Sequence, residues 1–442
     1  MSNSSVLVIG AGVTGITVAQ RLVENNIKVY LIEKESYIGG QALSYGCKGV
    51  NSCNDCSVCL LQRKIKDTEG YFSHVLFKAN SEIEEVIRKE KNFEITLRKT
   101  IPFIDPDKCQ GCGLCEKLCP SSAISISHPQ SIPQVYSLSK EQCLNFQNKE
   151  CYICLNSCPF GAISFNHKVE KETLSNISAI VLATGFEPWD PKLKVEYGYG
   201  VNKNVITATE LEKQIYIKGF VFRPSDKERA KKIAIIQCVG SRDRSTDSPN
   251  CSRVCCAYGM KMARFLKERD SEVEVSIFYI DIQPFGKEFT KFFTKSKDDY
   301  NIKYIKSIPS QISEDQKGKL KIKYEDSQRE TIKEEYFDLA VLSITMNPDK
   351  KFEKLSENLD IWVKDSGFCE NPNSMQTIKT NQREIFAAGA CQGPKDIAEC
   401  IANAENAALE VILFLRTLNN KVAKNEEQKE KREKLLCLKE RK

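Results

Sequence analysis

A glycine-rich loop near the N-terminus constrains the fold of this chain more than any other feature. The apolar run Val6–Ile9 is followed at once by Gly10-Ala11-Gly12-Val13-Thr14-Gly15, and Lys28–Glu33 begins after an apolar pattern of helical spacing. Glycines in such a loop allow a tight turn and the close approach of a pyrophosphate, and an acid after the second strand binds ribose hydroxyls. The pattern predicts an α/β dinucleotide-binding fold in which the cofactor contacts Gly10, Gly12, Gly15 and Glu33.

Three later segments match what an FAD-binding domain of the thioredoxin-reductase type needs. Gly39-Gly40-Gln41 follows the second strand, and Ala179–Gly185 and Ile385–Ala390 read as buried strands that end in glycine turns. An acid commonly follows the last glycine, but Ala390 stands there in this chain, so we expect flavin contacts from the backbone or from Gln392–Asp396. A helix after Pro394 would direct its positive end towards a reduced flavin. The predicted cofactor-binding residues are Gly40, Gln41, Thr184, Gly185, Gly389, Ala390 and Gln392.

A duplicated cysteine run predicts a two-cluster ferredoxin-like insert. Cys109-x-x-Cys112-x-x-Cys115-x-x-x-Cys119-Pro120 has the spacing of bacterial ferredoxins. The second copy has Cys143 farther out, followed by Cys151-x-x-Cys154-x-x-x-Cys158-Pro159. The fourth cysteine of each run binds the other cluster in such proteins, which pairs Cys109, Cys112 and Cys115 with Cys158, and Cys143, Cys151 and Cys154 with Cys119. Zinc also binds Cys-x-x-Cys pairs, but the duplication with both prolines favours 4Fe-4S clusters.

Four more cysteines stand where a second nucleotide-binding domain would carry its glycine loop. The apolar run Lys232–Ile236 reads as a buried strand, and a helical pattern begins at about Met260. Between them lie Cys238, Cys251, Cys255 and Cys256. Thiolates from a strand end and a helix start can converge on one centre, and sulfur ligands suit an iron–sulfur cluster. The alternative is four unligated thiols, although adjacent cysteines have no packing rationale.

A fourth cysteine group is less specific. Cys47, Cys53, Cys56 and Cys59 lie in a loop rich in glycine and asparagine, and only the last two form a compact pair. They either hold a fourth cluster or include one or two functional thiols among incidental ones. The remaining cysteines have no partners at ligand spacing, and we interpret them as structural or incidental: Cys369, Cys391, Cys400 and Cys437.

Composition decides the compartment and excludes some partners. Twenty cysteines occur in a chain whose first residues lead directly into a strand and show no signal peptide. Disulfide frameworks belong to short secreted domains, so we expect a reducing, cytoplasmic location in which most thiols bind metal or are redox-active. The net charge of +6 is spread along the chain, which argues against nucleic-acid binding. No apolar run approaches the length of a membrane span.

The predicted architecture is an α/β flavoprotein with two dinucleotide-binding-type domains and an inserted α+β ferredoxin-like domain. The second domain would be a βαβ series without a glycine loop, with strands at Glu274–Ile280, Ile302–Ile305 and Asp338–Ile344 and a hairpin-like pair at Lys319–Tyr324 and Lys333–Phe337. The expected boundaries are 1–101, 169–219 and 351–415 for the FAD-binding domain, 102–168 for the insert, 220–350 for the second domain and 416–442 for a charged tail.

These motifs resemble the flavoprotein component of heterodisulfide reductase, known as its A subunit, and the bacterial relatives of that protein. The similarity is carried by Gln237–Asp243, Cys251–Cys256, Cys56–Cys59 and Gly389–Asp396, and it runs from Val6 to about Leu415. It implies that Cys238, Cys251, Cys255 and Cys256 hold a 4Fe-4S cluster close to FAD, and that Lys261 lies beside the flavin as a catalytic residue. The full methanogen protein has an extra N-terminal domain and a C-terminal ferredoxin domain that find no match here.

The resemblance implies a cytoplasmic oxidoreductase subunit with FAD and three 4Fe-4S clusters, or four if the Cys47–Cys59 loop holds one. Its partners would be other heterodisulfide-reductase-like subunits and ferredoxin or another one-electron carrier, with a disulfide, sulfur or quinone-linked acceptor. Further candidate partners are a second copy of the chain and a membrane-associated, quinone-linked subunit. A freestanding NAD(P)H-dependent disulfide reductase is the main alternative, and a cluster-assembly scaffold would not need the FAD fingerprint.

Overall fold

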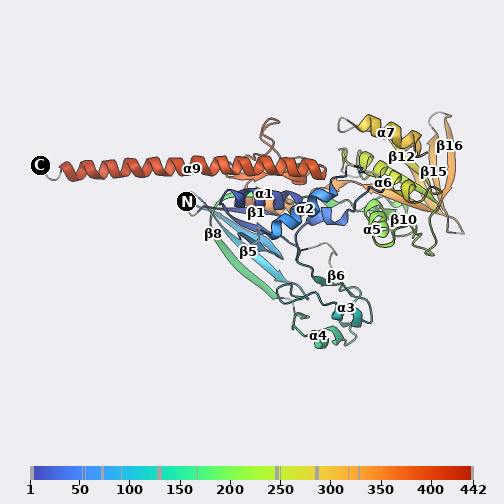
Figure 1. Cartoon of the computed structure of the whole chain (residues 1–442), viewed down its shortest axis with the longest axis horizontal. Coiled ribbons are helices and arrows are strands. Elements are labelled where there is room, and N and C mark those ends of the chain that lie inside the picture. The colour runs from blue at the N-terminus through green and yellow to red at the C-terminus, as the bar shows by residue number, and fades with distance from the viewer. Residues whose placement is uncertain are drawn as a thin grey trace.

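The protein consists of two α/β units side by side, with a small cysteine-rich insert on the first and a long C-terminal helix that extends away from the body (Figure 1). The structure is a computed structural model. It describes residues 4–51, 53–54, 56–70, 74–90, 92–126, 132–166, 168–243, 248, 250–283, 288–316, 318–326 and 329–439. The side chains of 68–69, 216–218 and 421–439 lie outside this description.

The first unit is built on a sheet with the strand order β3-β2-β1-β8-β5-β4, and β19 also pairs with β8. The strands β1, β2, β3 and β19 and the end of β8 run parallel, whereas β4 and β5 pair antiparallel. This parallel half is the predicted dinucleotide-binding fold. The bounds are β1 Ser5–Ile9, β2 Lys28–Ile32, β3 Val75–Lys78, β4 Ser81–Arg88, β5 Phe93–Ile101, β8 Lys168–Leu182 and β19 Ile385–Ala387.

Helices cover both faces of this sheet because its central strands are apolar throughout. In β1, Val6 and Val8 face a core formed with α1 (Val13–Glu24), α2 (Val58–Glu69) and α9 (Ile397–Lys439). Leu7 and Ile9 point to the other face, where α8 (Phe352–Leu359) packs. A strand covered on both faces reads as a continuous apolar run, which is why its sequence was recognisable.

The long helix α9 joins the core to the C-terminus. Its first part packs against α1 through the small side chains Ala404, Ala407 and Ala408, all buried. The predicted charged tail continues the same helix as far as Lys439. This end of the helix projects beyond the sheet (Figure 1). Among the residues that the structure describes, none of the helices combines the length and apolar character needed to cross a membrane.

The insert is joined to the first sheet between two paired strands. β5 and β8 run antiparallel as far as the pair Ile101 and Lys168, and the chain between them forms a small body below the sheet in Figure 1. Its short elements are α3 Leu114–Leu118, β6 Ile124–Ile126, β7 Tyr136–Leu138 and α4 Ile153–Ser157. Their apolar centre is small, with Ile104, Ile124 and Ile163 packed among cysteines. A core of this size is small for a stable body, and bound metal is one usual source of additional stability.

The second unit carries a parallel sheet in the order β10-β17-β11-β12-β13. A three-stranded antiparallel sheet, β14-β15-β16, packs over it, and Phe278 contacts Tyr324 and Phe337 between the two layers. The predicted strands and hairpin are confirmed. The bounds are β10 Val205–Thr207, α5 Ala208–Lys218, β11 Lys232–Val239, α6 Cys255–Arg269, β12 Glu274–Tyr279, α7 Phe289–Asp298, β13 Lys303–Lys306, β14 Pro309–Glu314, β15 Leu320–Asp326, β16 Thr331–Phe337 and β17 Leu339–Ile344.

Two crossing segments connect the units. β9 (Glu187–Pro188) leaves the first sheet and β18 (Met346–Asn347) leaves the second, and they pair antiparallel. The chain therefore passes from the first unit to the second and back along one two-stranded ladder.

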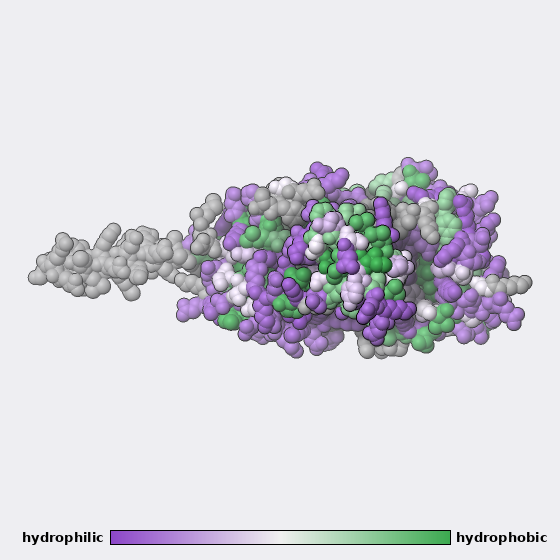
Figure 2. Space-filling view, turned by 90° about the horizontal axis from the view of Figure 1, so that it is seen from below, coloured by the Kyte–Doolittle hydropathy of each residue, from purple (hydrophilic) through white to green (hydrophobic). Residues whose placement is uncertain are grey.

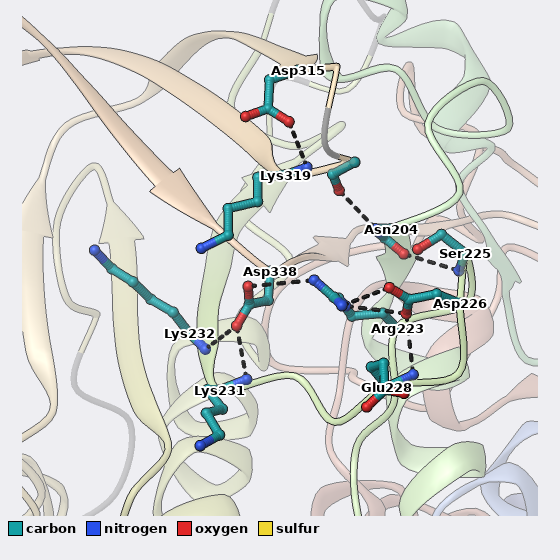
Figure 3. Close-up of polar contacts among 11 residues, drawn as sticks. Asn204, Arg223, Ser225, Asp226, Glu228, Lys231, Lys232, Asp315, Lys319 and Asp338 are labelled. Atoms are coloured by element: carbon teal, nitrogen blue, oxygen red, sulfur yellow. Dashed lines mark hydrogen bonds and ion pairs between the residues drawn. The ribbon is translucent and has the colours of Figure 1, made fainter.

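Asp338 fixes the start of the central strands of the second unit (Figure 3). Its Oδ2 accepts hydrogen bonds from the backbone N–H groups of Lys231 and Lys232, both at 2.9 Å. Arg223 approaches Oδ1 at 3.8 Å and also pairs with Asp226. Because Asp338 precedes β17 and Lys232 begins β11, this carboxylate joins the ends of two adjacent strands.

We expect Asp338→Ala to destabilise the second unit by about 2–4 kcal/mol, because two partly buried backbone N–H donors would lose their acceptor. Hydrogen–deuterium exchange of the peptide that spans β11 measures the change. Asp226→Ala removes a more exposed ion pair from the same network and should cost less than about 1 kcal/mol. Equal exchange in both variants would show that Asp338 is not the anchor of these strands.

Candidate cofactor and cluster sites

A cavity of about 1150 Å³ lies between the two units. Its wall includes the ends of β1, β2 and β8 in the first unit and the start of α6 in the second. Ligands of open α/β sheets bind outside the carboxyl ends of the strands, and ordinary ligand pockets occupy about 300–1,000 Å³. The position and size therefore suit a dinucleotide.

The three glycines of the first loop have different roles. A Cβ at Gly10, whose φ is +101°, would lie 2.4 Å from the Ala183 carbonyl oxygen, and one at Gly15 would lie 1.8 Å from the Gly10 oxygen. These two glycines allow the backbone to pack. A Cβ at Gly12 would meet only the Cα of Gly40, at 4.0 Å. Gly12 lines the cavity at the N-terminus of α1, so the missing side chain leaves room where a pyrophosphate would sit.

Glu33 connects the glycine loop to the end of β2. Its Oε2 accepts a hydrogen bond from the Ala11 N–H at 2.7 Å, and its Oε1 accepts one from the Glu35 N–H at 3.1 Å. Burial raises the pKa of this carboxyl group. Glu33 also contributes to the cavity wall. Each carboxylate oxygen keeps a second acceptor position, which fits the predicted contact with ribose hydroxyls.

The other predicted FAD residues are divided by the structure. Gly40, Gln41, Thr184, Gly185 and Ala390 line the cavity. The Thr184 hydroxyl is buried, and no described residue provides it with a hydrogen-bond partner. A buried group of this kind calls for a ligand or ordered water, and a bound dinucleotide would supply one. The cavity and its residues thus fit the cofactor that the sequence predicts.

Gly15, Gly389 and Gln392 lie outside the wall of this cavity. The Gln392 side chain is instead buried, and its amide donates a hydrogen bond to the Thr377 carbonyl oxygen at 2.5 Å. The neighbouring Lys395 does line the cavity, and its Nζ donates to the Gly389 carbonyl oxygen at 3.0 Å. Lys395 belongs to the segment from which we expected flavin contacts, but the sequence did not single it out.

One face of α6 brings Cys255, Tyr258 and Lys261 to the same cavity. They are spaced three residues apart, which places them along one side of a helix. The predicted catalytic Lys261 therefore lies in the wall of the dinucleotide cavity, in line with a cysteine of the predicted cluster.

The thiols of Cys238, Cys251, Cys255 and Cys256 form one group at the end of β11 and the start of α6. Hydrogen bonds from Cys238 and Cys256 lower the pKa of the Cys255 thiol. Burial raises the pKa of Cys251, and the nearby Cys255 thiol raises it further. Cys238, Arg242 and Arg253 all have φ near +60°, a strained backbone that often marks functional sites. The four thiols therefore lie together, which is the arrangement that the sequence predicts for a cluster.

In the insert, Cys154 lies near thiols of both cysteine runs. Burial raises its pKa, and the neighbouring thiols of Cys143, Cys119 and Cys151 raise it further. These four also line one small cavity. Cys119 comes from the first run, so the group matches the predicted exchange of the fourth cysteine. Each run ends in an equivalent turn. The Ala123 N–H donates to Cys119 Sγ, and the Ala162 N–H donates to Cys158 Sγ.

Within the described part of the chain, no three His, Cys, Asp or Glu side chains are grouped closely enough to hold one metal ion. A four-iron cluster presents a different iron to each thiolate, so its ligands stand farther apart than those of a single ion.

The Cys47–Cys59 loop is held against the second unit by contacts that the sequence did not predict. Lys48 Nζ forms a buried ion pair with Glu212 of α5 at 2.5 Å, and the Tyr258 hydroxyl donates to the other oxygen of Glu212. Cys47, Cys53 and Cys59 are exposed, while Cys56 lines the cavity. The fourth cluster stays a prediction.

The fold defines a class of proteins, the two-domain flavoproteins that resemble thioredoxin reductase. The structure matches thioredoxin reductase of T. acidophilum with a TM-score of 0.53 at 13% identity, over 94% of this chain and 100% of that one. Thioredoxin reductase of Lactococcus lactis gives 0.52 at 15% identity, over 93% and 99%. This confirms the predicted fold class. Residues 8–58 match an NAD(P)-binding Rossmann-like domain, and residues 102–125 match a 4Fe-4S binding domain.

Sequence comparison then finds the chain similar to A subunits of heterodisulfide reductases. The chain is 35% identical over 421 residues to the A subunit of the H(2):CoB-CoM heterodisulfide,ferredoxin reductase of Methanothermobacter thermautotrophicus. The matched region covers 91% of this chain and 62% of that protein. It is 37% identical over 424 residues to one of the iron-sulfur A subunits of the CoB–CoM heterodisulfide reductase of Methanopyrus kandleri, over 91% and 63%. The similarity to these A subunits extends over most of this chain. The chain spans about three-fifths of the length of these relatives.

Proposed function

We propose that this chain is an FAD and iron–sulfur electron-transfer subunit of a heterodisulfide-reductase-like complex. The observation that carries the proposal is the shared cavity wall, in which Gly12 stands on one unit and Cys255 and Lys261 stand on the other. A cluster held by Cys255 would thus border the dinucleotide. When bound, FAD supplies the exchange between two-electron and one-electron transfer that a cluster alone lacks.

The chain's own residues would hold these groups in fixed positions. The glycine loop and Glu33 would bind the pyrophosphate and ribose, and Lys261 and Lys395 would place positive charge along the cavity. Cys238, Cys251, Cys255 and Cys256 would hold one cluster, and the two cysteine runs of the insert would hold two more. The loop from Cys47 to Cys59 would account for a fourth.

The surface of the insert supports docking of a one-electron carrier. Figure 2, seen from the side on which the insert lies, shows hydrophobic residues gathered among polar ones on this face. Exposed apolar side chains close to the cysteine runs include Leu114, Leu118, Tyr152, Ile153 and Phe160. Clustered exposed apolar residues often mark protein contacts. We propose ferredoxin or a similar carrier there, and other subunits of a cytoplasmic complex, disulfide- or quinone-linked, as the remaining partners.

Metal and flavin analysis tests this proposal. The anaerobically purified chain should contain about one FAD and roughly 12–16 iron atoms, from three or four cubane clusters. Cys255→Ala should lose about four of these iron atoms and keep its FAD. Cys369→Ala removes a buried thiol elsewhere in the first unit and should change neither. Iron near eight in the unaltered chain would restrict the clusters to the insert and refute the role of the Cys238–Cys256 group.

One observation favours a second candidate function, a freestanding NAD(P)H-dependent disulfide reductase. Cys56 of the Cys56-x-x-Cys59 pair lies in the wall of the dinucleotide cavity, where a thiol could exchange electrons with a flavin. The two candidates differ in how electrons enter the chain, which is the first experiment discussed below.

A further inference from the structure

Three residues close in sequence to Cys238 and Cys251 have buried polar side chains for which the described part of the chain offers no hydrogen-bond partner. Gln237, Ser241 and Ser252 are 4%, 2% and 1% exposed. Among the described residues, neither amide atom of Gln237 and neither serine hydroxyl has a hydrogen-bond partner of ordinary geometry. An unsatisfied buried polar group costs about 1–3 kcal/mol, so native proteins keep few of them. Three next to one group of thiols indicate that a ligand of this site supplies the missing partner.

The positions of these side chains are built into the surrounding elements. Gln237 precedes Cys238 in β11, and its Nε2 would lie only 2.0 Å from a Cβ at Gly259 in α6. Gly259 stands one turn after Cys255, and glycine in a helix interior costs about 1 kcal/mol relative to alanine. The helix therefore accepts a destabilising residue where the Gln237 amide packs against it, one turn after Cys255.

The two serines belong to the cysteine loops themselves. The Ser241 N–H donates a hydrogen bond to the Cys238 carbonyl oxygen at 3.1 Å, which folds this residue back over the thiol-bearing turn. Ser252 follows Cys251. Its carbonyl oxygen accepts a hydrogen bond from the Val254 N–H at 2.7 Å, so Ser252 lies in the short turn that leads from Cys251 into Cys255.

We propose that Gln237, Ser241 and Ser252 donate hydrogen bonds to the sulfur atoms of the cluster held by these four cysteines and thereby raise its reduction potential. The inference rests on the proposed function, because it takes the cluster at this site as given. Reduction adds one electron to the cluster, and no proton or bond is transferred. Hydrogen-bond donors stabilise the more negative state more strongly, so they favour the reduced cluster.

A redox titration followed by electron paramagnetic resonance tests this inference in the anaerobic full-length chain. Ser252→Ala and Ser241→Ala should each make the midpoint potential of this cluster more negative, and the double variant should shift it further. We expect about a tenfold change in the ratio of reduced to oxidised cluster at fixed potential for each, which is 59 mV for a one-electron couple. Ser252→Thr keeps the hydroxyl and should restore most of the shift.

Controls separate this inference from the proposed function. Ser356→Ala removes a buried serine of α8, in the other unit, and should leave the potential unchanged. A full iron content with the same potential in both single variants and the double variant would refute the hydrogen bonds and leave the cluster assignment intact. If Ser252→Ala loses the cluster, the midpoint potential of the Ser241→Ala variant decides whether the hydrogen bonds exist. Absence of this cluster from the unaltered chain would instead refute the proposed function.

Discussion

Stoichiometric NADPH or NADH is expected to leave the flavin of this chain oxidised, whereas a reduced ferredoxin or a low-potential dye should reduce it rapidly. The second unit presents Cys238–Cys256 at the strand end and helix start where a nicotinamide-binding domain would carry its glycine loop. Hydride transfer needs the nicotinamide held in reactive geometry, and losing that positioning lowers rates by roughly 100-fold or more. Stopped-flow absorbance at the flavin band measures both reactions.

Two variants make this experiment decisive. Cys255→Ala should keep FAD and slow flavin reduction by one-electron donors, because the sulfur that borders the cavity is lost. Cys56→Ala should have little effect on the same reaction. Rapid bleaching by NADPH, with strong loss of turnover in Cys56→Ala, would support the freestanding disulfide reductase instead.

Gly12→Val should yield a folded chain without flavin. Among the described residues, a Cβ at Gly12 would meet only the Cα of Gly40, at 4.0 Å, which is ordinary van der Waals contact. The fold should therefore accept a side chain here, but the valine would fill the space at the N-terminus of α1. We expect FAD affinity to fall by at least roughly 100-fold, about 2.8 kcal/mol. Flavin content after purification and fluorescence titration of the apoprotein with FAD measure the loss.

Glycines at other positions provide matched controls. Among the described residues, Gly70, after α2, has only the Asp67 carbonyl oxygen near a Cβ, at 3.5 Å. Gly70 is not among the residues that line the cavity, so Gly70→Val should keep its flavin. Gly15→Ala should instead unfold the first unit, because its Cβ would lie 1.8 Å from the Gly10 oxygen. Retained FAD in folded Gly12→Val protein would show that no pyrophosphate lies over this glycine.

The features that can be predicted from the sequence are those that depend on residues close together in the chain. The glycine loop, the buried strands of both units and the fold class follow from short apolar runs and the turns that end them, as β12 and β17 illustrate. The antiparallel strands β4 and β5 carried no such signal. Their alternation of apolar and charged side chains, as in Glu82–Arg88, is common to any half-exposed strand.

The contacts that complete the site depend on residues far apart in the chain. Lys48 and Glu212 are 164 residues apart, and nothing near either one predicts their ion pair. Gln392 was expected at the flavin, but its amide reaches Thr377, whose position depends on the fold of the preceding loop. Ser241 and Ser252 look like ordinary loop residues until the structure shows that both are buried and that no described residue provides a partner for their hydroxyls.

The attachment of the insert has a consequence for how such chains diversify. Ile101 and Lys168 are direct partners across β5 and β8, so the chain leaves and re-enters the first sheet at one rung of a ladder. A short turn would close this rung as well as a whole domain does, because the ends are already adjacent. Under the proposed cluster assignment, the number of electrons that the protein stores is thus a modular trait. An exchange of that module must also replace one backbone contact, because the Ile132 carbonyl oxygen of the insert accepts a hydrogen bond from Ile38, next to the glycines that border the cavity.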